Sequence, residues 1–495
     1  MKKKLNILFV ISEADPYIKV GGLGDIGGTL PIALKSIKTR NNTDYEIDVR
    51  VILPYHDQIK DKHVPSEWIT NFRLMTKRGF KDVYLSRIVN SEVPIYLIDG
   101  NLIRNTKIYT DNPYRDLEKF AFFSIASLEV CKHLNWQPDI LHSHNWHTAL
   151  SVKSLRQRRA RDTFFKKTRS LYTVHNLPYS GGNYPEILET YGIRPAFDSH
   201  IFSEMRTLPM AVALEASDAI STVSRTYAEE ITTPEFGNLY ENYLLANKQK
   251  ITGIVNGIMM DQWNPATDTI IAQTYDENSL DDRIKNKLSM QEEFNLAVDP
   301  RMPLFAMVGR MSQQKGIDLC LDALRRMGEL PWQAIILGTG EREIENNARS
   351  LANELSDRVR VEIRYDGVLA RKLYAAGDMF LMPSRYEPCG IAQMISMLYG
   401  CIPIARATGG LKDTIIDASK KPKAYTGFLF DKANTWEAEN AMRRALNEYQ
   451  DQEAWRNLQL RAMNQDFSWE KQAWEYVKLY EKLLAQNKIK QVRIK

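Results

Sequence analysis

Short apolar runs recur along the chain, and each is followed by a longer stretch in which apolar residues fall at helical spacing. An apolar run of about four to eight residues is typical of a buried strand. Regular alternation of such strands with helices predicts βαβ units and parallel sheets. The runs are Ile7–Ile11, Val49–Leu53, Ile140–His142, Ser170–Val174, Ala219–Val223 and Ile251–Val255, then Leu304–Val308, Ala334–Leu337, Val359–Ile363, Met379–Met382 and Cys401–Ala405.

The polar interval Asn264–Pro300 separates these runs into two series, which predicts an α/β chain of two Rossmann-like, doubly wound domains. We expect the first domain to cover residues 1–255 and the second 256–467, because the turn signal Asn256-Gly257 ends the last strand of the first series. At 495 residues the chain is too long for a single core. A final helix over 468–486 has an apolar stripe and should pack on the first domain.

Composition narrows the class of protein. A net charge of +5 over a chain that is 26% charged is too dilute to favour nucleic acid as a partner. No apolar run approaches the roughly 20 residues of a membrane span, so we expect no membrane partner. The four cysteines show no CxxC or zinc spacing, which favours reduced thiols. The basic, apolar start is too short for a signal peptide and is interpreted as the first strand. We expect a cytoplasmic protein, or one of the plastid stroma if a transit peptide was removed.

The stretch Leu381–Thr414 contains two successive strand-to-helix turns. The first turn carries Arg385, Glu387 and Gly390, and the second carries Gly409-Gly410. Open α/β sheets bind ligands at the carboxyl ends of their strands, and a glycine-rich turn brings backbone N–H groups against a phosphate. This stretch is therefore predicted to be a ligand site.

Two cations follow the strand Leu304–Val308, at Arg310 and Lys315, and flank a turn into a helix. Convergent cations near a helix N-terminus suit a leaving diphosphate held without a metal. Tyr365 and Asp366, which end another strand, could frame a nucleobase. The sequence contains no Walker A loop and no DxD carboxylate pair.

Near the N-terminus, Gly22, Gly24 and Gly27 match GxGxxG, which taken alone suggests a nicotinamide oxidoreductase. The ribose-binding acid is missing, because Asp48 precedes its strand instead of following it. Lys19 before the glycines suits a charged phosphate ester or diphosphate better.

Histidines follow two further strands, in the segment His142–His147 and at His175. Their spacing fits no metal motif, so packed imidazoles and an aromatic platform for a sugar are the better interpretation. His175 could be a general base, a hydrogen-bonding ligand or a satisfied core histidine.

Taken together, these motifs resemble the bacterial glycogen synthase and plant starch synthase family of retaining glucosyltransferases. The resemblance covers nearly the whole chain, from KVGGLGD through HSHNWHTAL, YTVHNLPYSG, STVSRTYAEEI, GRMSQQKGIDL, LGTG, MPSRYEPCGIAQ and ATGGLKDT to FSW. It implies the glycosyltransferase-B fold, in which two Rossmann-like domains face each other across a deep cleft. It also implies transfer of glucose from a nucleotide-glucose, ADP-glucose being favoured, to the non-reducing end of an α-1,4-glucan or maltooligosaccharide, with no metal or other cofactor.

The resemblance also assigns roles to residues. The implied catalytic residues are Glu387, Arg310, Lys315 and His175. The implied donor-binding residues are Lys19, Gly21, Gly22, Asn256, Tyr365, Gly390, Ile391, Gly409, Gly410 and Leu411. Those implied on the sugar or acceptor side are His144, Asn145, Trp146, His147 and Asn176.

Several positions depart from the family's usual sequence. Asn145 replaces an aspartate, and Ala392 replaces a threonine. The segments Phe197–Ala216 and Thr232–Lys250 diverge in the region where the family contacts its acceptor. These departures leave open UDP-glucose as donor, a different small acceptor, and a non-catalytic glucan-binding relative. The oligomeric state is also left open.

Overall fold

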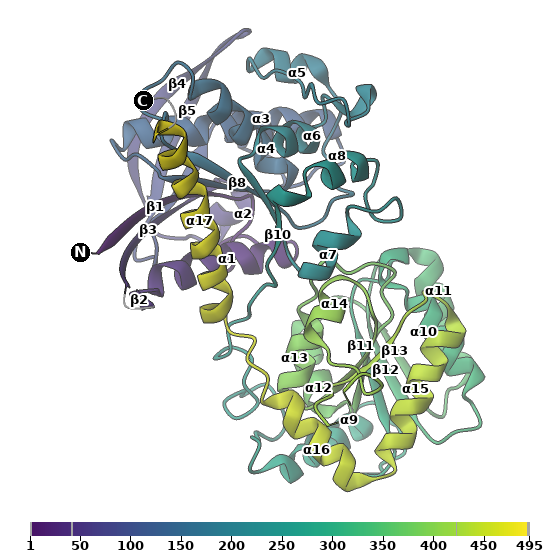
Figure 1. Cartoon of the computed structure of the whole chain (residues 1–495). Helices are drawn as coiled ribbons and strands as arrows, with labels where there is room; N and C mark the ends of the chain where they lie inside the picture. Colours follow the sequence, from purple (N-terminus) through teal and green to yellow (C-terminus); the bar gives the residue numbers. More distant parts are fainter. Residues whose placement is uncertain (1, 41–42, 422, 493–495) are drawn as a thin grey trace. The chain divides into compact units, whose positions relative to one another are not determined.

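The computed structural model describes residues 2–40, 43–421 and 423–492, which divide into two compact units (Figure 1). Unit 1 comprises Met1–Gly257 with Trp469–Lys495, and unit 2 comprises Ile258–Ser468. The division follows Gly257, within the turn region where the sequence places the domain boundary. Each unit has its own sheet and its own core.

The sheet of unit 1 runs in the order β10-β9-β8-β7-β1-β3-β6-β5-β4, with β2 paired to β3. Neighbours from β10 to β6 are parallel, whereas β5 is antiparallel to both β6 and β4. The strands are β1 (Lys3–Val10), β2 (Thr39–Arg40), β3 (Thr43–Pro54), β4 (Ser66–Thr76), β5 (Gly79–Ile88), β6 (Ile95–Asp99), β7 (Ile140–His144), β8 (Arg169–Val174), β9 (Ala219–Thr222) and β10 (Ile251–Gly253).

Helices cover both faces of this sheet (Figure 1). Helices α3, α4 and α6 pack together on one face, and α1 and α17 lie side by side on the other. The helices are α1 (Gly22–Ser36), α2 (Asp57–Asp61), α3 (Pro113–His133), α4 (Asn145–Arg158), α5 (Pro185–Thr190), α6 (Pro209–Ala216), α7 (Arg225–Glu230), α8 (Glu241–Ala246) and α17 (Trp469–Val492).

The sheet of unit 2 is parallel throughout the described residues and has the order β13-β12-β11-β14-β15-β16. Counted along the chain this is 3-2-1-4-5-6, the strand order of a dinucleotide-binding Rossmann sheet. The strands are β11 (Leu304–Val308), β12 (Gln333–Gly338), β13 (Val359–Ile363), β14 (Met379–Met382), β15 (Ile402–Arg406) and β16 (Phe428–Phe430).

The helices of unit 2 form two groups on opposite faces of its sheet (Figure 1). Helices α10 (Ile317–Arg326), α11 (Arg342–Glu354) and α15 (Thr435–Tyr449) form one group. Helices α9 (Ile284–Glu293), α12 (Gly367–Ala376), α13 (Ala392–Leu398) and α16 (Gln452–Met463) form the other. The short helix α14 (Gly409–Thr414) follows β15.

The prediction of a two-part α/β chain is confirmed, and every predicted apolar run forms a strand. The prediction missed β2, β6, β16 and the antiparallel pair β4–β5. In β4 only Phe72, Leu74 and Thr76 are buried, so the apolar pattern is confined to one end of a largely exposed edge strand. Edge strands commonly carry polar and charged residues, which hides their period-two signal.

The C-terminal helix α17 belongs to unit 1. Its predicted stripe is buried at Trp469, Ala473, Tyr476, Val477 and Tyr480. The hydroxyl of Tyr480 lies 2.8 Å from Nδ1 of His142 on β7, within hydrogen-bonding distance. The helix therefore packs against the sheet and also makes a buried polar contact with a strand next to β1.

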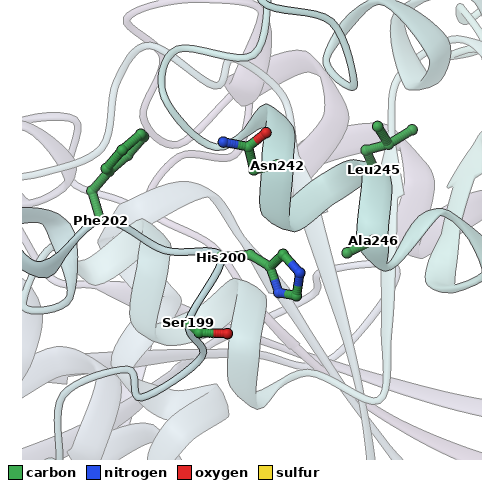
Figure 2. A pocket seen from close by; sticks show the side chains of 6 residues that line it. All are labelled: Ser199, His200, Phe202, Asn242, Leu245 and Ala246. Atoms are coloured by element: carbon green, nitrogen blue, oxygen red, sulfur yellow. The ribbon is translucent and has the colours of Figure 1, made fainter.

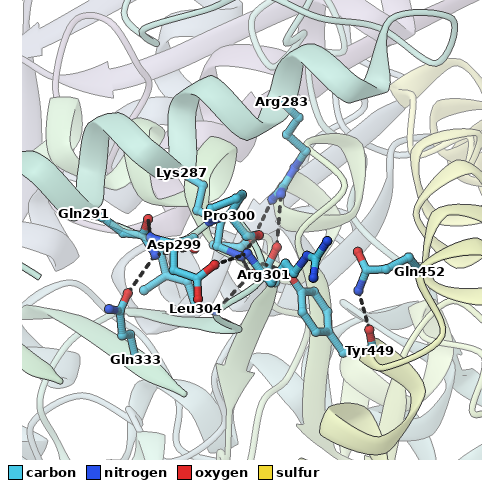
Figure 3. Close-up of polar contacts among 12 residues, drawn as sticks. Arg283, Lys287, Gln291, Asp299, Pro300, Arg301, Leu304, Gln333, Tyr449 and Gln452 are labelled. Carbon is cyan, nitrogen blue, oxygen red and sulfur yellow. Dashed lines mark hydrogen bonds and ion pairs between the residues drawn. The ribbon is translucent and has the colours of Figure 1, made fainter. Parts of the chain in front are cut away.

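The polar interval Asn264–Pro300 is an integral part of unit 2, as the predicted domain bounds place it, and it supplies buried side chains (Figure 3). Lys287 of α9 is fully buried, and its ammonium contacts Asp378 Oδ2 at 2.7 Å, the Tyr449 hydroxyl at 2.9 Å and the Pro300 carbonyl at 3.0 Å. Asp378 in turn accepts the Leu304 amide of β11 at 2.9 Å. A buried charge is tolerated when it is paired and fully hydrogen-bonded, so these charged residues are core residues of unit 2.

Candidate active site

In unit 2 the strand order reverses between β11 and β14, which are hydrogen-bonded neighbours. Ligands of open α/β sheets bind at such a switch point, outside the carboxyl ends of the two strands. The turn after β11 carries Arg310 and Lys315, and the turn after β14 carries Glu387. The topology thus brings together residues that the sequence analysis assigned separately.

Lys315 and Glu387 form an ion pair at this switch point. The ammonium of Lys315 lies 2.5 Å from Glu387 Oε2, which also accepts the Ser384 hydroxyl at 3.0 Å. Glu387 is only 6% exposed, whereas Lys315 is half-buried. The pair holds one carboxylate and one cation in fixed positions, with the cation still reachable by a ligand.

The two turns are fastened to each other by backbone as well as side chains. Gly316 has φ +61°, and a Cβ at this position would lie 2.2 Å from the Pro383 carbonyl oxygen. The Arg385 amide donates to the Gln314 carbonyl at 2.8 Å. The Arg385 guanidinium donates two hydrogen bonds to the Asp318 carboxylate, at 2.8 and 2.7 Å. Only glycine fits at 316, because a side chain would force the turns apart.

Gly409 and Gly410 pack against the turn after β14. A Cβ on Gly409 would lie 2.0 Å from the Glu387 carbonyl oxygen, and one on Gly410 would lie 2.0 Å from that of Cys389. The Gly410 amide donates to the Glu387 carbonyl at 3.1 Å. Packing alone therefore explains why glycine is needed at both positions. That Gly409, Gly410 and the buried Leu411 approach a diphosphate stays a prediction.

Gly390 and Ile391 lead into α13. Gly390 has φ +72°, and Ile391 is the residue that precedes the helix. The Gln393 side-chain amide donates to the Cys389 carbonyl at 3.2 Å and to Thr414 Oγ1 at 3.1 Å, while its Oε1 is buried without a hydrogen-bond partner among the described residues. Gln393 was not among the site residues predicted from the sequence, and an unpaired buried acceptor in this turn marks it as a further candidate.

The side chains of Arg310 and Tyr365 are exposed, in contrast to the buried Glu387. Arg310 is exposed and, within the described part of the chain, has no hydrogen-bond or ion-pair partner. Tyr365 is 89% exposed. The neighbouring Asp366 caps α12 by accepting the amides of Val368 and Leu369, so its contact is structural.

In unit 1 the strand order reverses between β1 and β7, and the glycine loop follows β1. Gly21 and Gly22 have no other atom within 4 Å of where a Cβ would lie, so a ligand can approach their backbone. Lys19 contacts Asp25 at 2.5 Å and Asp15 at 3.5 Å. Burial alone would lower the pKa of Lys19, but these carboxylates outweigh burial and raise it. The loop thus presents a fully charged ammonium.

Glu13 is a residue of this loop that the sequence analysis missed. It is buried, and its Oε2 accepts the Val20 amide at 2.6 Å and the Gly21 amide at 3.0 Å. A carboxylate that accepts consecutive amides fixes the loop in the way that a bound anion would. The sequence does contain a signal that could have identified Glu13: an acidic residue just past the end of the first strand, which is a ligand-side position.

The histidines after β7 and β8 form a cluster in which His142 and His144 are buried and His175 is half-buried. His144 Nδ1 lies 2.9 Å from His175 Nε2, and the His142 and His144 ring centroids are 4.1 Å apart. Burial lowers the pKa of His175 to about 3, and burial with the neighbouring His142 and His175 lowers that of His144 well below its ordinary value. A histidine with so low a pKa is a weak base, so the structure favours a hydrogen-bonding role for His175.

The remaining predicted residues of unit 1 surround this cluster. Asn145 has φ +55°, and its Oδ1 accepts the His175 amide at 2.8 Å. Trp146 packs on Phe120 with centroids 5.2 Å apart and on the buried His147 at 4.3 Å. Trp146 and His147 therefore pack mainly against other side chains of unit 1. Asn145 fixes the backbone just after β8 through its hydrogen bond with the His175 amide.

Asn176 and Asn256 each keep a buried side-chain oxygen that has no hydrogen-bond partner among the described residues. Buried polar atoms are nearly always paired in folded proteins, so an unpaired one marks a position that a ligand or water can satisfy. Among the described residues no group of His, Cys, Asp or Glu could hold a metal ion. In that same part of the chain, no helix is both long and apolar enough to span a membrane.

Two doubly wound units, each with a ligand-side glycine turn and a cation at its switch point, define a glycosyltransferase of the glycosyltransferase-B class. Residues 6–246 match the family described as starch synthase catalytic domain, and residues 289–459 match glycosyl transferases group 1. The chain belongs to the glycogen synthase and starch synthase family of glucosyltransferases. The resemblance seen in the sequence is thereby confirmed.

Relatives match along almost the entire length. The chain is 37% identical to glycogen synthase of Clostridium perfringens over 97% of this chain and 99% of that protein. It is 36% identical to glycogen synthase of Bacillus cereus strain Q1, over 97% of this chain and 100% of that protein. The solved catalytic domain of starch synthase IV from Arabidopsis thaliana, bound to ADP and acarbose, is 31% identical with a TM-score of 0.88, covering 98% of this chain and 100% of that one. A sucrose-phosphate synthase from Thermosynechococcus elongatus, 18% identical with a TM-score of 0.60 over 97% of this chain and 100% of that chain, shares the fold.

Proposed function

We propose that this glucosyltransferase transfers glucose from ADP-glucose to the non-reducing end of an α-1,4-glucan with retention of configuration and without a metal. The observation that carries the proposal is the Lys315–Glu387 pair at the switch point of unit 2, in a chain of the glycogen and starch synthase family. The solved starch synthase IV, which was bound to ADP and acarbose, supports an adenine nucleotide and an oligosaccharide as the two ligands.

In this proposal the cations act on the leaving group. Lys315 and the exposed Arg310 contact the diphosphate of the donor, and Lys19 and the Gly21-Gly22 backbone contact it as well. The bond between the anomeric carbon and the phosphate oxygen breaks while the acceptor hydroxyl oxygen bonds to the same face of that carbon. The hydroxyl proton passes to the leaving phosphate. Fixed cations stabilise the charge that develops on the diphosphate, which is the protein's main contribution to catalysis.

Glu387 binds a hydroxyl of the transferred glucose and favours positive charge at the anomeric carbon. Its burial strengthens both effects, because a carboxylate interacts more strongly with charge when water is excluded. His175, as a neutral imidazole, hydrogen-bonds the donor sugar, and Tyr365 stacks on the base. Asn256 and Asn176 use their unpaired oxygens for sugar hydroxyls.

The test is a matrix of donors and acceptors with the purified full-length protein. ADP-glucose and UDP-glucose are each combined with glycogen, maltoheptaose and maltose in the presence of EDTA, and labelled glucose incorporation is measured. We expect incorporation from ADP-glucose into glycogen and maltoheptaose, with an α-configured product by NMR. Loss of activity in EDTA that Mg²⁺ restores would overturn the metal-free mechanism, and no incorporation into any glucan would overturn the polymer synthase.

A second candidate is a glucosyltransferase of the same fold that prefers UDP-glucose or a different small acceptor. The observation in its favour is the divergence of Phe197–Ala216 and Thr232–Lys250 from the family's usual sequence. Consumption of UDP-glucose in preference to ADP-glucose, or of donor only with a non-glucan acceptor, would identify it. A non-catalytic glucan-binding relative would consume neither donor.

We also propose a cytoplasmic location. All four cysteines are buried and none is part of a disulfide, as a reducing compartment allows, and the bacterial relatives are glycogen synthases. Fractionation of the native cells should recover the protein with cytoplasmic enzymes, and recovery with the envelope would contradict the proposal.

A further inference from the structure

Positive charge gathers in unit 1 at the edge of the sheet where β8, β9 and β10 begin. Arg169 is the first residue of β8, and Lys250 directly precedes β10. Arg156 and Arg159 lie at the C-terminal end of α4, the helix that leads to β8. We propose that these four cations, the basic cluster, bind a phosphate group that is either free or carried by a small molecule. The inference goes beyond the proposed function and does not depend on it.

The topology of the sheet brings the basic cluster together. Strand β9 pairs in parallel with β8 on one side and with β10 on the other. Arg169, Asp218 and Lys250 stand at the starts of these three neighbouring strands, and parallel strands begin at the same edge of a sheet. The glycine loop and the histidine cluster follow the opposite, carboxyl-terminal ends of β1, β7 and β8. The basic cluster is therefore distinct from the candidate active site.

The carboxylates beside β8 are already hydrogen-bonded to other groups. Asp218 Oδ1 accepts Arg159 Nη1 at 3.0 Å, and Asp218 Oδ2 accepts the amide and the hydroxyl of Ser170 at 2.8 and 3.1 Å. Asp139, which precedes β7, accepts the Asn6 amide at 2.9 Å. Arg159 thus neutralises Asp218, while its own Nε is buried and has no hydrogen-bond partner among the described residues.

The acids on the other side of the basic cluster, Glu215 and Asp198, are occupied as well. Glu215 contacts the ammonium of Lys153 at 2.6 Å and accepts the Asp198 amide at 3.0 Å. Asp198 Oδ1 accepts the His200 amide at 2.9 Å and lies 2.9 Å from His200 Nδ1. The loop that carries His200 faces α8 across a hollow of about 420 Å³ (Figure 2). Within the described part of the chain, neither carboxylate forms an ion pair with Lys250.

Arg169 and Lys250 are therefore half-buried cations whose side chains have no hydrogen-bond or ion-pair partner among the described residues. Burial and the neighbouring Arg156 lower the pKa of Lys250, although nearby carboxylates oppose the change. Burial lowers the pKa of Arg169 as well, and Arg159 adds to that effect against the opposing Asp218. A lowered pKa means that the folded protein disfavours the charged form of a base. A bound anion would relieve this repulsion.

A phosphate group fits this set of donors. A guanidinium presents N–H groups in a planar fork that matches two phosphate oxygens, and an ammonium adds a compact positive charge. Arg156, Arg169 and Lys250 have no carboxylate partner among the described residues, which suits the roughly two negative charges of a phosphate at neutral pH. The loop between α4 and β8 adds the exposed Arg161 and Lys166. Like charges without acidic partners select an anion, whereas a neutral sugar would leave their repulsion in place.

The test titrates inorganic phosphate, and glycerol 3-phosphate as a simple phosphate ester, into the full-length protein at constant ionic strength, by isothermal titration calorimetry. Lys250→Met and Arg169→Met should each weaken binding by about tenfold, because each removes a charge-assisted hydrogen bond. Lys38→Met is the matched control, since Lys38 is an exposed lysine of unit 1 outside the basic cluster, and it should bind as wild type does. Tighter binding of the ester would identify a phosphorylated small molecule as the ligand, and tighter binding of inorganic phosphate would identify the free anion.

A second measurement separates binding from a structural role. Because the folded protein disfavours the charges of Lys250 and Arg169, both methionine variants should keep or raise the Tm in a chloride buffer without phosphate. Lys315→Ala, which changes the candidate active site, should keep the phosphate binding that Lys250→Met and Arg169→Met lose.

Four outcomes would overturn the proposal. The first is that the wild-type protein binds neither phosphate, or that both methionine variants bind as tightly as wild type. The second is loss of binding in Lys315→Ala alone, which would assign the phosphate to the diphosphate site of the proposed mechanism. The third is a lower Tm of both methionine variants in chloride, which would make the two cations structural. The fourth is binding of heparin but of neither small phosphate, which would indicate a surface for a polyanion.

Discussion

The ammonium of Lys315 lies 2.5 Å from Glu387 Oε2, although 72 residues separate the two in the chain. The pair forms because β11 and β14 are neighbours at the point where the strand order of unit 2 reverses. In the proposed mechanism one partner binds the diphosphate and the other the glucose of the same donor. The ion pair therefore sets the distance between the two groups that act on the bond being broken.

Removing either partner should impair catalysis strongly. Lys315→Ala and Glu387→Ala should each lower kcat by about 100-fold or more, because each removes a charge that stabilises the transition state. The measurement is steady-state glucose transfer from ADP-glucose to glycogen. Lys372→Ala is the matched control, since Lys372 forms a partly exposed ion pair with Glu293 at 2.8 Å and should keep full activity. Near-normal turnover in both active-site variants would show that the site is misassigned.

Gly316→Ala should destabilise unit 2. The added methyl group would meet the Pro383 carbonyl oxygen at 2.2 Å, and the residue would have to keep φ at +61°. We expect the free energy of unfolding to fall by about 2 kcal/mol or more, measured by urea denaturation. Gly309→Ala is the control, because nothing lies within 4 Å of its Cβ position, and its stability should stay close to wild type. Equal stability of the two variants would contradict the close approach of the two turns.

The buried histidines predict a loss of stability in mild acid. Burial lowers the pKa of His56, His147 and His175 to about 3, whereas an unfolded histidine titrates near about 6.5. Below that value the unfolded chain binds more protons than the folded one, so stability is complete above about pH 6.5 and falls as the pH approaches 3. Each histidine should subtract about 1.4 kcal/mol at about pH 5.5.

Urea denaturation at about pH 8 and about pH 5.5 measures this effect. His147→Gln should flatten the pH dependence by the contribution of one histidine, because glutamine does not titrate. An unfolding free energy that is equal at both pH values would show that these imidazoles are protonated in the folded protein.

Tyr480→Phe should weaken the attachment of α17 to unit 1. The change leaves Nδ1 of the buried His142 without its partner at 2.8 Å, which costs about 1–3 kcal/mol. Tyr191→Phe is the control, because the buried Tyr191 hydroxyl has no hydrogen-bond partner among the described residues, and its removal should cost little. Urea denaturation measures both, and equal effects would argue against the Tyr480–His142 contact.

Much of the fold was predictable because the buried strands are nearly continuous apolar runs, as in Leu304–Val308 and Met379–Met382, whose predicted bounds the structure reproduces. The edge pair β4–β5 was not, because an exposed edge buries only part of each strand. The charged segment that contains Arg283 and Lys287 was placed in the second domain only as a polar interval between strands, because a sequence does not show that a lysine will find a buried aspartate. The roles predicted for the individual site residues remain predictions.

By itself, the sequence determined the class of fold, the family, and the turns at which ligand-binding residues stand, because these depend on local patterns of apolar residues and glycines. The tertiary structure alone decided which of those residues meet. It paired Lys315 with Glu387, placed Glu13 under the glycine loop, and brought the loop at His200 against α8. These contacts join residues distant in the chain, and they depend on strand order and packing, which no local pattern specifies.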